Sequence, residues 1–328
     1  MKLKQLIILT FLFINPLFPC DYCVVGLQQY YSSENQSSIR LDFRFQQFDG
    51  LIRGSNPIQS RDNLKASYST SYLTYNYSFQ QFGISATVPF TSKIQENKFT
   101  LDASSFLHFH HGDRSELAGT NNLTDSYIEK YSLNGIGDMI ILARYTILQE
   151  MSSVFYKINI QAGSTIPTGS IDSRDEFKYL LHPHLQNGTG TSTLLFNVNG
   201  FLSEENRSVT ASIMIGKPLN SKNKYQEGLG ISYDLIYRHQ FKPTFLSSES
   251  FITTNIGLLG KNIGIEKYNN IKIEDSGGTY IFGVVGTSFL VYENIIFEVN
   301  GQFPIYKNLN GTQSNEKLRI LTSLMYLL

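Results

Sequence analysis

The sequence has no tryptophan, two cysteines and few charged side chains. Charged residues make up 16% of the 328 positions, which argues against the surface of a typical soluble protein. Acidic and basic residues number 27 each, so the charge gives no reason to expect binding to nucleic acid. Two thiols also fall short of the four ligands of a structural zinc site.

After the first 20 residues, no apolar run approaches the ~20 residues that a membrane-spanning helix needs. If the chain lies in a membrane, a closed β-barrel is the remaining way to satisfy its backbone. The composition agrees, because Tyr, Phe, Thr, Ser, Asn and Gly dominate and suit exposed strands and wet turns.

The first 20 residues have the form of a secretory signal peptide. Lys2 and Lys4 give a positive start, and Leu6–Phe13 is apolar apart from one threonine. This run is too short for a transmembrane anchor. Cys20 raises lipidation as an alternative, although the bulky residues before it do not fit a lipoprotein site. We therefore expect a signal peptide over 1–20, a periplasmic lead-in over 21–36 and one barrel domain over 37–328.

Alternation of apolar and polar residues is the strongest structural signal. In Ser37–Phe48, one face carries Ile39, Leu41, Phe43 and Phe45, and the other carries alternating polar side chains. The pattern recurs to the C-terminus and predicts about 12 strands. These cover Ser37–Phe48, Leu64–Phe79, Phe82–Phe90, Gly137–Leu148, Val154–Ile166, Gly190–Leu202, Ser208–Lys217, Glu227–Arg238, Ser247–Gly260, Thr279–Tyr292, Ile295–Phe303 and Lys317–Leu328.

The connections between these strands alternate in length. The long ones cover Asp49–Asn63, Thr91–Ile136, Pro167–Thr189, Pro218–Lys224, Lys261–Gly278 and Tyr306–Glu316. Transmembrane barrels have short periplasmic turns and longer external loops. The sequence therefore predicts an all-β, antiparallel transmembrane barrel with its apolar face toward lipid. A soluble barrel with an apolar core is the alternative, but such a barrel has no reason to alternate long and short connections.

The polar face of the strands would then line the lumen. The charged members of this face have both signs and are Arg40, Asp42, Arg44, Lys157, Asp234, Arg238, Glu298 and Arg319. They could form a salt-bridged network that fills a narrow barrel, or a polar path for a solute. Pairing of the last strand with the first is expected to bring Arg319 towards Arg40, Asp42 or Arg44.

Cys20 and Cys23 form a C-x-x-C pair. An oxidising periplasm would favour a disulfide between them if both survive processing. Metal binding and thiol exchange are the other uses of this spacing. No thioredoxin-like βαβ pattern follows, so the pair is interpreted as structural or incidental before metal binding, and metal binding before catalysis.

Five of the six histidines fall in two predicted external loops. The candidate metal ligands there are His108, His110, His111, Asp113, His182 and His184. Imidazole and carboxylate groups bind zinc, copper or nickel. The simpler interpretation is that exposed loops tolerate polar residues, so metal binding stays an open alternative.

An outer-membrane hydrolase is a third hypothesis, because some barrels of this class are enzymes. The one histidine on a predicted strand, His239, falls in the outward apolar set near the periplasmic rim. No G-x-S-x-G motif accompanies it. The sequence therefore gives no catalytic residue, and we expect no enzyme and no cofactor.

Four short stretches resemble a family of outer-membrane barrels known as transporter-like or MetA-pathway of phenol degradation proteins. They are CDYC with SIRLDFRF, YNYSFQQFGISATVPF, GIGDMIILARY, and STIPTGSID followed by GTGTST. All lie within Cys20–Thr193, and the second half of the chain matches only in pattern. The resemblance implies an outer-membrane barrel that transports small, including apolar, compounds, and it transfers no catalytic residue.

These observations favour a channel or transporter for small solutes, apolar or aromatic ones included, in the outer membrane of a Gram-negative cell. The expected partners are outer-membrane lipid, a small-molecule solute and the barrel-assembly machinery. The alternatives are a non-transporting barrel that binds metal or a ligand through its histidine loops, and an outer-membrane hydrolase.

Overall fold

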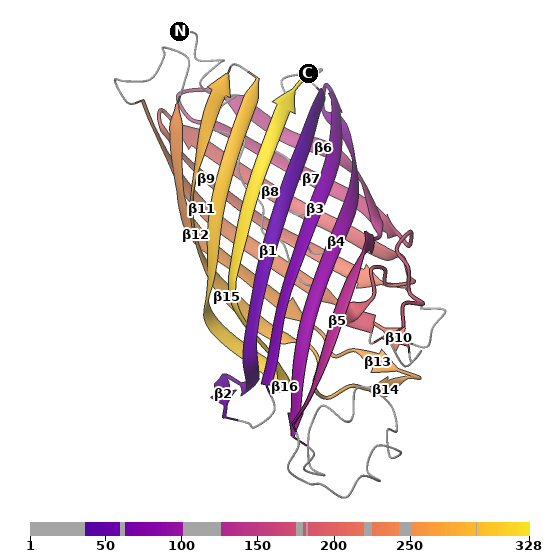
Figure 1. Cartoon of the computed structure of the whole chain (residues 1–328). Coiled ribbons are helices and arrows are strands. Elements are labelled where there is room, and N and C mark those ends of the chain that lie inside the picture. The colour runs from indigo at the N-terminus through magenta and orange to yellow at the C-terminus, as the bar shows by residue number, and fades with distance from the viewer. Residues whose placement is uncertain are drawn as a thin grey trace, which may run out of the picture.

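The computed structural model describes residues 37–59, 63–100, 126–174, 180–181, 183–219, 225–242, 251–292 and 294–328. Strands dominate these residues, and the chain closes into a single barrel (Figure 1). A short 3-10 helix, η4 (Pro183–Leu185), also lies among them. Within the described ranges, no helix is long and apolar enough to cross a membrane.

Eleven strand elements form the wall in sequence order, each antiparallel to the next. They are β1 (Ser37–Gly54), β3 (Asn63–Phe79), β4 (Phe82–Thr100), β6 (Met139–Met151), β7 (Phe155–Ile166), β8 (Thr193–Glu204), β9 (Arg207–Pro218), β11 (Gly230–Phe241), β12 (Ile252–Ile263), β15 (Gly278–Tyr292) and β16 (Ile295–Leu327).

The last element, β16, doubles back and so crosses the wall twice. Its first part pairs with β15 up to Leu309, and its second part pairs with β1 from Leu309 to Leu327. Strand direction reverses ten times between β1 and the first part of β16, so these two run the same way. The second part of β16 is antiparallel to β1, so the two parts of β16 run in opposite directions. The reversal falls at Gly311, which has a φ of 55°. Eleven elements, one of them passing twice, give twelve passes in the described wall, as the sequence pattern predicted.

The seam between β1 and β16 closes the barrel. The register runs from Ser38 opposite Leu327 to Gly54 opposite Leu309, with three irregularities near the far end. β1 begins and β16 ends at the same end of the barrel, where Leu328 N–H donates to Ser37 O at 2.9 Å (Figure 1). Closure leaves no unpaired strand edge at this seam, as a membrane-spanning sheet requires.

Turns of a few residues join most strands at the end that holds the C-terminus, although ten residues, 242–251, separate β11 from β12 there. Longer connections join most strands at the other end, where the reversal of β16 is the tight exception. The longer connections contain the added strands β2 (Asn56–Ile58), β5 (Ser126–Ile136), β10 (Tyr225–Gln226), β13 (Lys267–Tyr268) and β14 (Ile271–Lys272). β5 extends the wall by pairing with β4, and β10, β13 and β14 form a separate small sheet. The long-connection end is the external end by the rule for transmembrane barrels.

The two faces of the wall differ as the alternation predicted. In β1, Ile39, Leu41 and Phe43 point outward and are 42–49% exposed, while Arg40 and Asp42 between them are at most 2% exposed. Large apolar side chains are exposed on the outer face of every long strand. An apolar belt of this kind suits lipid and would be unfavourable in water.

Four predicted connections are partly strand. Asp49–Asn63 contains the end of β1 and all of β2, and Lys261–Gly278 contains the end of β12 with β13 and β14. The stretch Thr91–Ile136 was predicted to be loop throughout, yet β4 continues to Thr100 and β5 begins at Ser126. The stretch Tyr306–Glu316 was also predicted to be loop, yet it forms the tight reversal of β16. Both continue strands towards the external end, where outward apolar residues such as Ile94 and Tyr306 are too few for alternation to mark the strands.

Replacing an outward residue at the middle of the belt is expected to destabilise the barrel. Leu235→Arg on β11, 53% exposed on the outer face, should lower the free energy of unfolding by roughly 2–4 kcal/mol. Ile271→Arg is the control, because Ile271 is 72% exposed on the external hairpin beyond the wall. Urea unfolding in lipid vesicles measures both, and equal effects would contradict the assignment of the belt.

Candidate functional site

The predicted lumen residues all have buried side chains. Their exposed fractions lie between 1% and 7% in Arg40, Asp42, Arg44, Lys157, Asp234, Arg238, Glu298 and Arg319. Each lies on the inward face of its strand, since the alternate positions carry the exposed apolar side chains. Side chains with so little exposure do not line a wide aqueous pore, so the lumen is narrow at their level.

One inward network joins β1 to both passes of β16. Arg40 Nε donates to Asp42 Oδ1 at 2.7 Å, and Arg40 Nη2 donates to Ser323 Oγ at 2.9 Å. Ser323 Oγ donates in turn to Asp42. Glu298 Oε2 lies 3.8 Å from Arg40 Nη2. Paired groups offset the cost of burying their charges, which a lone ion would bear in full.

A second network lies nearer the external end. Arg319 donates to both oxygens of Glu316, and Gln46 Nε2 donates to Glu316 Oε1 at 3.1 Å. The Arg319 guanidinium carbon also lies 4.1 Å from the centre of the Phe282 ring. The pairing places Arg319 opposite Gln46, two residues from Arg44 along the inward face of β1, so the seam brings Arg319 towards Arg44 as expected. Arg40 and Asp42 lie further along and pair with Met325 and Ser323.

The inner face also carries apolar side chains, which the sequence analysis did not assign to the lumen. One buried cluster comprises Tyr72, Ile140, Leu142, Leu195, Met214 and Leu321. A larger one includes Phe155, Phe201, Ile236, Leu259, Phe282 and Ile296. The signal was available where apolar residues run without alternation, as in Met139–Leu142. An unbroken run of this kind means that both faces of the strand are apolar.

The connection between β7 and β8 folds back over the inner wall at the external end. Lys93 Nζ, inward on β4, donates to the carbonyl oxygens of His184 and Gln186 at 3.0 and 2.5 Å. Thr91 Oγ1, also on β4, donates to Asn187 Oδ1 at 2.8 Å. Gln186 and Asn187 are 4% and 3% exposed. Residues 183–189, named here the mouth segment, therefore narrow the external opening.

Asp138 holds this connection at two points. Its Oδ1 accepts from Gly169 N–H at 2.9 Å, and its Oδ2 accepts from the N–H and Oγ1 of Thr189 at 2.8 and 2.7 Å. Gly169 and Gly188 touch, and a Cβ on Gly169 would lie 2.5 Å from Gly188 Cα. Two of the four stretches that resemble the barrel family thus meet at one latch, which Asp138, Gly169 and Thr189 form.

His184 and Glu266 join the mouth segment to the β12–β15 connection. His184 Nε2 lies 3.0 Å from Glu266 Oε2, with the His184 side chain 45% exposed and that of Glu266 6% exposed. Burial lowers the pKa of His184, but the Glu266 carboxylate outweighs it, and the net pKa lies above the usual 6.5. Lys93 and Lys261 oppose the effect of Glu266, because their positive charges lower the pKa of His184.

The other candidate ligands lie outside the described residues. These are His108, His110, His111, Asp113, His182, Cys20 and Cys23. Among the residues that the structure does describe, no three His, Cys, Asp or Glu side chains are grouped as a metal site. His239 lies on the outer face of β11, opposite Arg207 near the short-turn end.

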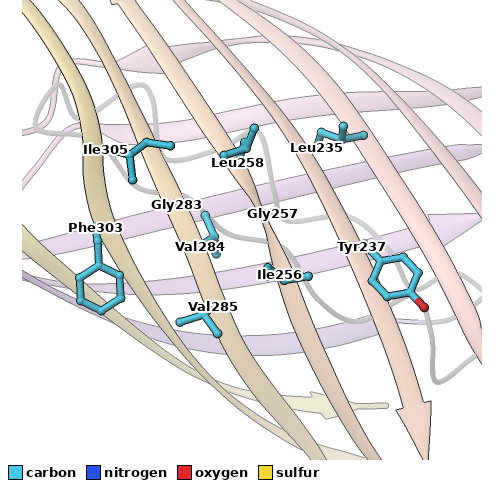
Figure 2. A pocket seen from close by; sticks show the side chains of 10 residues that line it. All are labelled: Leu235, Tyr237, Ile256, Gly257, Leu258, Gly283, Val284, Val285, Phe303 and Ile305. Atoms are coloured by element: carbon cyan, nitrogen blue, oxygen red, sulfur yellow. The ribbon is translucent and has the colours of Figure 1, made fainter.

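A hollow interrupts the apolar belt on the outside of the barrel. Figure 2 shows its lining side chains on β11, β12, β15 and β16. Gly283 leaves room at its centre, since a Cβ there would lie 3.5 Å from Ile305 Cγ2. Leu258, opposite Gly283, and Val285 border it and point outward. The hollow therefore faces lipid and is separate from the lumen.

No family model and no curated protein matches the sequence. Among solved structures, an outer membrane channel of the COG4313 group from Pseudomonas putida F1 superposes with a TM-score of 0.65. It is 12% identical, and the match covers 91% of this chain and 97% of that one. The Ralstonia pickettii toluene transporter TbuX gives a TM-score of 0.43 at 8% identity, with 90% of each chain covered. The first match shows that this chain has the fold of an outer-membrane β-barrel.

Removal of the Asp138 charge is expected to loosen the mouth segment. Asp138→Asn loses charged acceptors for Thr189 and Gly169, which weakens the latch by about 1.5–3 kcal/mol. Amide exchange at Gly169 and Thr189, followed by mass spectrometry, should accelerate. Asp172→Asn is the matched control, because Asp172 is exposed in the same connection and bonds only locally to Ser170. Unchanged exchange in Asp138→Asn would refute the latch.

The ion pair between His184 and Glu266 is expected to weaken as the pH rises. Because the folded-state pKa of His184 lies above 6.5, the stabilisation is complete below that value and is lost as pH rises through the raised pKa. Titration of the His184 ring by NMR should give a midpoint above 6.5, and Glu266→Gln should lower this midpoint. A midpoint that does not respond to Glu266→Gln would count against the pairing.

Proposed function

We propose that the protein is a passive outer-membrane channel for small solutes, including apolar and aromatic ones. The observation that carries the proposal is the inner face of the barrel, where paired charges and apolar clusters lie together. A barrel of twelve passes lies between the filled eight-stranded barrels and the open sixteen-stranded porins. A narrow lumen with mixed lining suits small, weakly polar molecules and gives no preference for strong charge.

The mouth segment supports a channel that opens and closes rather than a solid structural barrel. It is held to the wall by hydrogen bonds that Lys93 and Thr91 donate and that Asp138 accepts, and these bonds can exchange with water. A connection that served only stability would gain more from apolar packing. Loosening of these bonds would widen the external opening without unfolding the wall.

The setting of the protein follows from its outer face. We infer that the apolar belt contacts outer-membrane lipid and that the barrel-assembly machinery inserts the chain. Passive conduction requires neither a cofactor nor a catalytic residue.

Planar bilayers containing the purified protein are expected to show discrete conductance steps. The Asp138→Asn variant should spend more time open, because its mouth segment is held less tightly, and a several-fold rise in mean current is expected. The Asp172→Asn variant should resemble the unaltered protein.

Folding of each protein must be established by its heat-modifiable gel mobility and its β-sheet circular dichroism. Correctly folded protein that shows neither conductance nor solute flux would contradict the channel. Conductance that is equal in Asp138→Asn and the unaltered protein would leave the channel standing and refute the role of the mouth segment.

A further inference from the structure

A row of polar side chains crosses five neighbouring strands on the inner wall. The backbone register aligns Thr146 on β6, Asn159 on β7, Asn199 on β8 and Ser212 on β9. Asp234 on β11 continues the row opposite Ser212. All five point inward, and their exposed fractions are 1–7%. We name this row the polar ladder.

Hydrogen bonds run along the polar ladder from both sides. Thr146 Oγ1 donates to Asn159 Oδ1 at 2.8 Å, and Asn159 Nδ2 donates to Asn199 Oδ1 at 2.9 Å. Ser212 Oγ donates to Asp234 Oδ2. Hydrogen bonds therefore connect Thr146, Asn159 and Asn199 in one run and Ser212 with Asp234 in another. The break between the two runs lies between Asn199 and Ser212.

Two buried atoms in the polar ladder have no protein partner among the described residues. They are Asn199 Nδ2, a donor, and Asp234 Oδ1, an acceptor. Leaving a buried polar atom without a partner costs ~1–3 kcal/mol, so such atoms in native proteins call for an explanation. The backbones of β8 and β11 are separated by two strand spacings, about 10 Å, with Ser212 between them.

Apolar side chains border the polar ladder. Phe201 and Ile236 lie two residues further along β8 and β11, and Leu259 on β12 pairs with Asp234. Met214 lies two residues from Ser212 on β9. All four are at most 3% exposed. A molecule bound here would therefore meet one donor, one acceptor and an apolar surface.

We propose that the polar ladder is a binding site for neutral solutes that carry a hydroxyl group on a small apolar body. A hydroxyl accepts one hydrogen bond and donates another, which are the two bonds that Asn199 and Asp234 offer. The apolar body then packs against Phe201, Ile236 and Leu259. This inference rests on the proposed channel function and names the class of solute that the lumen selects.

Charge is discriminated at the same place. Asp234 carries a negative charge when ionised, and a solute carboxylate next to it would repel it. Arg238, two residues along the inward face of β11, donates to Thr210 Oγ1 at 3.1 Å, and its positive charge also acts on Asp234. Because the charges of Asp234 and Arg238 offset each other, the site favours a neutral solute and gives no net attraction to an acid.

The test uses the full-length protein in detergent and two probes with one carbon skeleton, benzyl alcohol and toluene. Calorimetric titration of Asn199→Leu and Asp234→Leu should show a loss of about fivefold to tenfold in affinity for benzyl alcohol, since each removes one hydrogen bond. Affinity for toluene should stay within about twofold. Leucine keeps the branched shape and the number of side-chain heavy atoms of Asn and Asp and suits the apolar surroundings, so folding should survive.

Asn76→Leu is the matched control, because Asn76 on β3 also has an unpartnered oxygen but lies outside the polar ladder. Both probes also partition into detergent, but this contributes equally to the measurements on the variants and on the unaltered protein, so it cancels in the comparison. Benzyl alcohol affinity equal in all four proteins would overturn the site and show that only water binds there. If conductance is absent while the ladder variants lose benzyl alcohol binding, the channel proposal fails and the binding site stands.

Discussion

Backbone hydrogen bonding between β1 and the second pass of β16 is the constraint on which the rest of the structure depends. A sheet in lipid must pair every backbone group, so an open edge is excluded and the first and last strands must meet. Their register sets which inward residues of β1 face those of β16. The network of Arg40, Asp42 and Ser323 exists only because this seam is closed.

Closure also divides the chemistry of the molecule into two faces. The outer face is apolar because lipid surrounds it, and the inner face is free to vary because lipid does not reach it. Paired charges, apolar clusters and the polar ladder share that inner face. Asp138 and Lys93 then hold one external connection across the mouth of the barrel, which narrows the opening there.

Alternation was enough to predict the strands, their number and the two faces, because lipid requires apolar residues at every second position of the belt. It did not reveal the small external strands β2 and β5 or the external ends of β1 and β4. Arg319 does lie towards Arg44, but its partner Gln46 could not be predicted, because the register also depends on the geometry of the turns that join the strands. The inward Leu142 and Phe282 were missed because lumen residues were assumed to be polar. The role of Asp138 depends on three stretches far apart in sequence, and no single pattern joins them.

Cross-linking at the seam measures the central claim most directly. Phe43 on β1 pairs with Thr322 on β16, and both point outward, so cysteines at these positions lie within disulfide reach. In a chain with Cys20 and Cys23 replaced by serine, mild oxidation should link positions 43 and 322 within one molecule, as peptide mass spectrometry would show. A cysteine at position 326 in place of 322 should not react with position 43. Failure of the 43–322 link in folded protein, or links only between molecules, would contradict a closed barrel.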